Sequence, residues 1–489
     1  MPLPPDPSSA PDPSSAPGPA SGPEPDAADG GADTSPAGAP DSAPADPTIL
    51  LPDEIAATLP IDRPEPASPE YRRDVYELSE RLRQLQRPIR ILSAVQWPPE
   101  VQERFFAADA QRQPEVSRDT YTPLAYDVRE LQRAYDDLIS DIRNQLGRFS
   151  PIAQLMVDRC EEWIATLEMI GARGTPDFAY HAARLYGRTS DVFHAGGPTT
   201  ADLGRDLSAR LSAIDAGGQL PADELTMDAH EAAAWLQERI DRVFDEDHVT
   251  VEVSDQIVAQ ALAGASRVRF RADARFSERQ LRLLEVHEVY VHVATTLNGR
   301  RQPVLTFLDK GPPSTTLSQE GLAVLAEVTA FTSHPTRLRR INDRVEAIHK
   351  VEDGATFLDV YRWFIDERGH TPQAAYADAM RVFRGSLPDA GPYPKDLAYN
   401  KGFIQVYNFL SVAIAQGKIY RIGLLFTGKT ALERIGLLSR AYAEGLLAPP
   451  RYLPPHFADL AGLGSWLAYS RFLNQLDLQR IEKDYAELL

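Results

Sequence analysis

The stretch that decides the fold and the chemistry of this chain reads Leu284-Glu285-Val286-His287-Glu288-Val289-Tyr290-Val291-His292. After a turn-rich loop the chain continues with Ser318-Gln319-Glu320-Gly321-Leu322-Ala323. Ser277 suits the N-cap of a helix over residues 278–297, because its hydroxyl can accept a hydrogen bond from a free backbone N–H of the first turn. The first stretch is therefore expected on a helix, which carries two histidines and a glutamate directly after the first of them.

These residue types are the parts of a zinc hydrolase. The imidazoles of His287 and His292 and the carboxylate of Glu320 would supply three ligands, which leaves the fourth position for water. Glu288 is the candidate base that takes the proton of that water as it attacks a carbonyl group. The alternative is that both histidines are ordinary polar residues of an apolar helix, with Glu320 favoured at a helix start by the dipole.

The spacing of the histidines makes a specific structural prediction. In the common H-E-x-x-H motif the histidines are four residues apart and share one helix face. Here they are five apart, and at about 100° per residue an ideal α-helix would separate them by roughly 140°. Both can bind one ion only if the helix carries an extra residue between them, which is a π-bulge.

Three more segments accompany the motif. They are Leu297-Asn298-Gly299-Arg300, Arg381-Val382-Phe383-Arg384-Gly385 and Lys395-Asp396-Leu397-Ala398-Tyr399-Asn400-Lys401-Gly402. With these pieces the chain after about residue 70 resembles the bacterial flavohaemoglobin-expression-modulating QEGLA-motif proteins, which are related to the eukaryotic microtubule-associated tyrosine carboxypeptidases. The resemblance implies a gluzincin-like zinc metallopeptidase domain with His287, His292 and Glu320 as ligands and Glu288 as the catalytic residue.

The reaction class implied by the resemblance is that of a metallopeptidase, and more narrowly of a carboxypeptidase acting on peptide or protein C-termini. Tubulin is not expected as the partner, because its tails are acidic and this chain has a formal net charge of −19 without an evident polybasic region. A non-catalytic metal-binding regulatory protein is the alternative. Glu288 argues against it, since a structural zinc site is closed by four ligands and needs no base. A hydrolase of a non-peptide amide or ester also stays open.

A carboxypeptidase needs a cation for the terminal carboxylate of its substrate, and arginine suits this role through bidentate hydrogen bonding. The candidates follow the Glu320 helix or lie in the segment of residues 395–402. They are Arg337, Arg339, Arg340, Arg344 and Lys401. Each can equally be a solvated surface charge.

Two further residues are candidates for supporting roles. Tyr399 could donate its hydroxyl proton to the oxyanion that develops on the attacked carbonyl, although core packing would also explain it. Glu327 lies two helical turns after Glu320 and could hydrogen-bond a liganding histidine, although it could also be a surface carboxylate. His194 and His334 are interpreted as ordinary loop histidines.

Composition excludes several other classes of protein. Net acidity disfavours nucleic acid and anionic membranes as partners, and no apolar run approaches the roughly 18 residues of a membrane span. Cys160 is the only cysteine, so neither an internal disulfide nor a multi-cysteine zinc site can form, and a cytoplasmic location is expected. The chain also contains no G-x-S-x-G elbow.

The order of patterns along the chain predicts its organisation. Residues 1–48 are almost entirely Pro, Ala, Ser, Gly and Asp and are expected to form a disordered tail. Residues 49–245 are expected to form an N-terminal helical portion and residues 246–489 the zinc-site portion. The two portions are expected to form one continuous catalytic domain that begins at about residue 68. Helical periodicity is expected over residues 71–85, 127–147, 150–171, 177–186, 200–213 and 227–244, and strands over 249–253 and 268–270. The predicted fold class is mainly α with a small β element.

Overall fold

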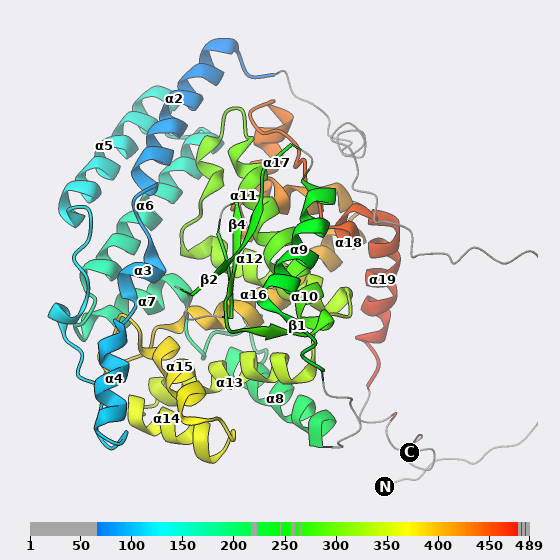
Figure 1. Ribbon diagram of the computed structural model, residues 1–489. Coiled ribbons are helices and arrows are strands. Elements are labelled where there is room, and N and C mark those ends of the chain that lie inside the picture. Colours follow the sequence, from blue (N-terminus) through cyan, green and yellow to red (C-terminus); the bar gives the residue numbers. More distant parts are fainter. Residues whose placement is uncertain are drawn as a thin grey trace, which may run out of the picture. The chain divides into compact units, whose positions relative to one another are not determined.

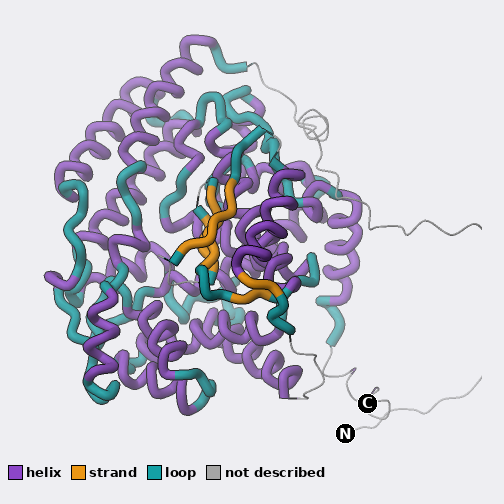
Figure 2. Tube along the Cα trace, viewed as in Figure 1, coloured by secondary structure: helices purple, strands orange, loops and turns teal. Residues whose placement is uncertain are grey.

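The computed structural model describes residues 66–489 except 217–222, 245, 256–259, 265, 478–480, 482–484 and 486–489. The predicted disordered tail, residues 1–48, lies outside the described residues. Helices make up most of the described chain, and strands form only a small patch among them (Figures 1 and 2). The prediction of a mainly helical fold with a minor β element is confirmed.

The helices before the histidine motif begin at well-formed caps. Ser68, Asp127 and Ser150 each accept a hydrogen bond from a backbone N–H in the first turn of the helix that they precede. The first α-helices are α2 (Pro69–Gln86), α3 (Ile91–Val95), α4 (Pro99–Ala107), α5 (Val128–Leu146), α6 (Pro151–Gly171), α7 (Asp177–Tyr186), α8 (Thr200–Ala216) and α9 (Ala229–Val243). Gly147 ends α5 with φ 81°, a backbone conformation that glycine adopts without strain.

The remaining helices carry and surround the histidine motif. The α-helices are α10 (Glu278–Leu284), α11 (Ala294–Arg300), α12 (Pro313–Thr329), α13 (Pro335–Glu352), α14 (Phe357–Asp366), α15 (Pro372–Phe383), α16 (Leu397–Ala415), α17 (Ile435–Ala443), α18 (Pro455–Ala458) and α19 (Leu460–Leu473). A π-helical segment, Glu285–Val293, joins α10 to α11. Short 3-10 helices are η1 (Arg118–Thr120), η3 (Thr306–Asp309), η4 (Pro394–Asp396), η5 (Ile419–Phe426) and η6 (Leu432–Arg434).

The strands form two small sheets. In the first, β2 (Thr250–Ser254) pairs in parallel with β4 (Arg267–Arg271), and β3 (Ala261–Ala263) pairs antiparallel with the other edge of β4. Val268 and Phe270 alternate with more exposed neighbours and are fully buried, so one face of this sheet packs on the core. In the second sheet, β1 (Met227–Asp228) pairs antiparallel with β5 (Arg275–Phe276).

The helix predicted over residues 227–244 begins two residues later than expected. The side chain of Asp228 accepts hydrogen bonds from the backbone N–H groups of His230 and Glu231, and the Glu231 carboxylate accepts one from the backbone N–H of Asp228. This capping box fixes the helix start at Ala229. Met227 and Asp228 are left extended and pair with β5, a long-range contact that local periodicity does not reveal.

One large hydrophobic cluster contains residues from both the N-terminal portion (49–245) and the zinc-site portion (246–489) that the sequence suggests, for example Trp163 and Phe426. A second cluster gathers the aromatic side chains of α4, α14 and α15 around Phe105 and Phe357. The described residues belong to a single compact unit.

Cys160 is fully buried in the large cluster, and burial raises the pKa of its thiol, which agrees with a packing role. Among the described helices, none is both long and apolar enough to cross a bilayer.

Two glycines let α12 and α16 approach each other closely. A Cβ atom on Gly321 would lie 2.3 Å from the backbone carbonyl of Gly402, and one on Gly402 would lie 2.1 Å from the carbonyl oxygen of Leu317. Only hydrogen atoms fit between the two backbones at these positions. This contact sets the distance between Glu320 on α12 and Tyr399 on α16.

We therefore expect Gly321→Ala to lower the free energy of unfolding by about 1–3 kcal/mol, because the added methyl group forces two helix backbones apart. Urea denaturation of both proteins measures the change. Gly436→Ala in α17 is the matched control, since nothing lies within 4 Å of its Cβ position, and a helical glycine replaced by alanine stabilises by roughly 0.5–1 kcal/mol. An unfolding midpoint for Gly321→Ala equal to that of the wild type would contradict the close approach.

Candidate metal centre

The two histidines lie on a π-helix. Residues Glu285–Val293 adopt this conformation, in which the backbone hydrogen bonds join residues five apart instead of four. His287 and His292 therefore point to the same side, with their ring centroids 4.9 Å apart and the rings nearly perpendicular at 83°. The predicted π-helical distortion is confirmed, and it extends over nine residues rather than one inserted position.

Side chains satisfy the carbonyl groups where the π-helix returns to α-helix. The hydroxyl of Thr295 donates to the carbonyl oxygen of Val291 at 2.6 Å, and that of Thr296 donates to the carbonyl oxygen of His292 at 2.8 Å. The ammonium group of Lys429 donates to the same His292 carbonyl at 2.9 Å. These side-chain donors add to the backbone hydrogen bonds at the junction, where the carbonyl of Val291 also accepts from the N–H of Ala294.

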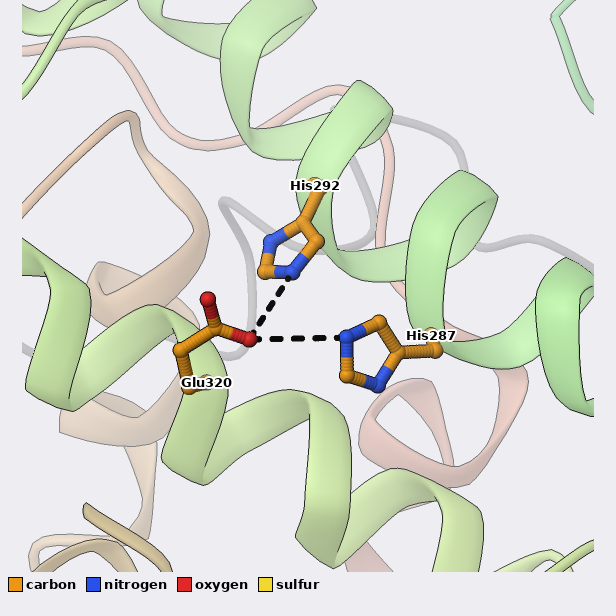
Figure 3. Close-up of side chains that lie close together, drawn as sticks. All are labelled: His287, His292 and Glu320. Carbon is orange, nitrogen blue, oxygen red and sulfur yellow. Dashed lines mark ion pairs between the residues drawn. The ribbon is translucent and has the colours of Figure 1, made fainter. Parts of the chain in front are cut away.

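Three side chains converge on one point (Figure 3). The Nε2 atoms of His287 and His292 each lie 3.5 Å from Oε2 of Glu320, and the three ligand atoms all lie within 4.8 Å of one another. Donor atoms around a tetrahedral zinc ion are about 3.3 Å apart, given metal–ligand bonds of roughly 2.0–2.1 Å. Oε2 of Glu320 is buried and has no hydrogen-bond partner among the described residues, so the donor set fits a cation placed between these atoms.

Glu327 hydrogen-bonds His287 from the other side. Its Oε1 lies 2.5 Å from Nδ1 of His287, and the guanidinium of Arg337 donates to Oε1 and Oε2 at 2.6 and 3.0 Å. Burial raises the pKa of Glu327. The charge of Arg337 and the hydrogen bond with His287 outweigh this effect and lower the pKa to about 2. An ionised Glu327 accepts a hydrogen bond from the Nδ1–H group of His287. The unprotonated Nε2 of this imidazole then faces Glu320.

The carboxylates around His287 prepare it for a cation. Burial alone would lower the pKa of this imidazole, but Glu320 and Glu327 raise it well above the ordinary value. A metal ion between the ligands would take the place of the proton that these negative charges otherwise attract.

Glu288 and Tyr399 lie next to the converging ligands. Oε1 of Glu288 is 4.0 Å from Nε2 of His287, and its side chain is 26% exposed, so it can reach a solvent molecule in the centre. The ring of Tyr399 stacks beside that of His287, with centroids 6.5 Å apart. The structure thus brings His287, His292, Glu320, Glu288, Glu327 and Tyr399 together, and their chemical roles stay predictions.

A family model of microtubule-associated tyrosine carboxypeptidases matches residues 103–475. The chain belongs to this family. No curated protein matches the chain in a sequence search. The matched region includes the π-helix, α12, α13 and α16, so every residue of the converging group lies within the carboxypeptidase family domain. A hydrolase acting at peptide or protein C-termini is the activity class that this membership supports.

Two lysines of the carboxypeptidase domain were missed by the sequence analysis as site residues. Nζ of Lys395 donates to Oε1 of Glu320 at 3.1 Å, which leaves Oε2 for the histidines. Nζ of Lys429 donates to Oε1 of Gln319 at 2.8 Å besides the His292 carbonyl. Burial lowers the pKa of Lys429 to about 7, although Glu320 and Glu288 raise it. Lys395 lies in a segment that carried the resemblance, whereas nothing in the sequence around Lys429 signals its position.

The cations predicted to bind a substrate carboxylate have other partners. Arg337 is paired with Glu327, and Arg340 and Arg344 both donate to Asp378, at 3.3 and 3.1 Å. Lys401 donates to Asp191 at 2.6 Å. Arg337, Arg340, Arg344 and Lys401 thus each have a carboxylate partner among the described residues, and their role in binding a substrate carboxylate stays a prediction.

The two loop histidines lie outside the converging group. Nδ1 of His334 accepts a hydrogen bond from the backbone N–H of Thr336 at 3.3 Å and so caps α13. His194 is exposed, and its Nδ1 is 3.1 Å from the carbonyl oxygen of Ala195. Both agree with the interpretation as ordinary loop residues.

Proposed function

We propose that this protein is a zinc-dependent carboxypeptidase of the gluzincin type, in which two histidines of one helix and a glutamate of a later helix hold the metal. The observation that carries the proposal is the convergence of Nε2 of His287, Nε2 of His292 and Oε2 of Glu320, at 3.5 Å from each histidine to the glutamate. Family membership supports the C-terminal direction of cleavage. Zinc is proposed from the ligand types, because two imidazoles and one carboxylate suit it, although iron or manganese could use similar ligands.

A bound zinc ion would supply a Lewis acid that polarises the scissile carbonyl and lowers the pKa of a coordinated water. Glu288 would take the proton of the attacking water and return it to the leaving amine. The Tyr399 hydroxyl would donate to the carbonyl oxygen as negative charge develops there. Glu327 would hold the imidazole of His287 in one tautomer, and Lys395 would orient Glu320.

The substrate is proposed to be the C-terminus of a peptide or protein. The family takes its name from microtubules and tyrosine, but a chain with a net charge of −19 would be repelled by acidic tubulin tails. We therefore propose a bacterial QEGLA-type member with a substrate other than tubulin, located in the cytoplasm. Nucleic acid and membranes are not expected partners of such an acidic protein.

The proposal is tested by incubating the protein with a pool of random hexapeptides that have free C-termini. Mass spectrometry is expected to find peptides shortened from the C-terminus, and a zinc chelator should abolish the shortening until zinc is returned. Internal cleavage would rule out an exopeptidase. Trimming that survives complete removal of the metal would rule out the zinc mechanism.

A further inference from the structure

Arg384 is a buried cation that has no hydrogen-bonded partner among the residues that the structure describes. It follows α15 and is 7% exposed. Its Nε is buried with no hydrogen-bond partner, and no described carboxylate forms an ion pair with its guanidinium. Arg159 is buried to the same degree, yet it donates to the backbone carbonyls of Lys310 and Lys429 at 3.2 and 3.0 Å. Buried guanidinium groups are normally satisfied in this way, so Arg384 requires an explanation.

The nearby carboxylates are already used by other arginines. Asp396 accepts from Nε and Nη2 of Arg381 at 2.8 and 3.0 Å. Arg344 lies 3.8 Å from Asp396 and 3.0 Å from Asp378.

Arg340 also pairs with Asp378. The cluster thus contains four arginines and two aspartates, namely Arg340, Arg344, Arg381, Arg384, Asp378 and Asp396. The guanidinium carbon of Arg384 lies 5.5 Å from the ring centroid of Tyr393, a cation–π contact that leaves its N–H groups unpaired. Burial lowers the pKa of Arg384, and the charge of Arg381 acts in the same direction. The cluster therefore carries an excess of positive charge, which an anion would neutralise.

Arg384 lies near Lys395 and Tyr399, two residues that adjoin the converging ligands. Nζ of Lys395 is 3.1 Å from Glu320 and 5.4 Å from the ring centroid of Tyr399. Arg384 is close enough to Lys395 and Tyr399 to interact with both electrostatically. A carboxypeptidase requires a cation close to its catalytic centre, because the terminal carboxylate of its substrate is one residue away from the carbonyl that is attacked.

We propose that Arg384 binds the free α-carboxylate of the substrate and thereby selects the C-terminal residue for removal. This inference rests on the proposed function. It assigns to Arg384 a role for which Arg340, Arg344 and Lys401 are also candidates, although each of those three is paired with an aspartate. The guanidinium supplies two parallel N–H groups that match a carboxylate. An unpaired buried charge destabilises the free protein, and the bound substrate would compensate it.

The first test measures binding without relying on catalysis. The probe is 3-phenylpropionate, a carboxylate with an aromatic side group, compared with its uncharged amide. At tenfold its dissociation constant, the carboxylate should raise the melting temperature of the wild type by roughly 2 °C, and the amide should not. Arg384→Met should abolish the rise and should itself melt no lower than the wild type, since it removes an unpaired buried charge. Arg242→Met, which removes a surface pair with Glu238, should keep the response.

A response that is equal in the wild type and Arg384→Met, or no response in the wild type, would overturn the assignment. A large loss of stability in Arg384→Met would also contradict it, because it would give this arginine a structural role.

The second test compares random hexapeptide pools with free and with amidated C-termini. Arg384→Met should lower kcat/KM for the free-acid pool by roughly 100-fold and change cleavage of the amidated pool little, while Arg384→Lys should recover part of the loss. If the wild type trims neither pool but the Arg384-dependent melting shift is present, the carboxylate site stands and the peptidase function is wrong. If Arg384→Met trims the free-acid pool as fast as the wild type, the peptidase function stands and the carboxylate site is wrong.

Discussion

Replacing Glu288 with glutamine is expected to lower peptide hydrolysis by roughly 10³-fold while the metal stays bound, because the amide cannot accept the proton of the attacking water. Glu288 is beside the ligands but is not one of the three converging groups. Hydrolysis of the free-acid peptide pool and metal content should be measured on the same preparation.

Glu278→Gln is the matched control for this change. Glu278 is an exposed residue of the preceding helix that pairs with Arg282, so its replacement should leave kcat/KM unchanged. Full activity in Glu288→Gln would remove Glu288 from the reaction. Loss of the metal together with the activity would assign it to the ligand set instead.

Replacing Glu320 with alanine is expected to weaken zinc binding by far more than about 100-fold, which is the upper range for the loss of an outer-shell hydrogen bond. The change removes one of the three proposed ligands and leaves Lys395 without its carboxylate partner. Competition with a coloured zinc chelator measures the affinity.

Glu320→Gln separates ligand loss from misfolding, since its amide oxygen can still accept the hydrogen bond from Lys395. We expect it to fold like the wild type and yet bind zinc weakly. Wild-type affinity in both variants would exclude Glu320 as a ligand.

Local signals in the sequence predicted much of the helical framework. The start of α6 follows from Ser150 and a proline in the first turn, and the end of α5 follows from Gly147. The five-residue spacing of His287 and His292 predicted the π-helix, because the chemistry requires both imidazoles on one side. A hydrogen bond between a motif histidine and Glu327 was one of two possibilities that the helical spacing left open, and Glu327 accepts it from Nδ1 of His287.

The rest of the site depends on contacts between distant segments. Arg340 and Arg344 resembled free cations in the sequence, because Asp378, which neutralises them, lies on another helix. Lys429 reaches the carbonyl of His292 from 137 residues away. Arg384 was noticed only as part of a matching segment, since burial without a partner becomes visible only in three dimensions.

The proposed zinc site of His287, His292 and Glu320 can be checked by elemental analysis of the purified wild type and of His292→Ala. We expect about one zinc ion per chain in the wild type and much less in the variant, because the remaining imidazole and carboxylate form an incomplete site. Equal zinc in both proteins, or none in the wild type after zinc has been supplied, would contradict it.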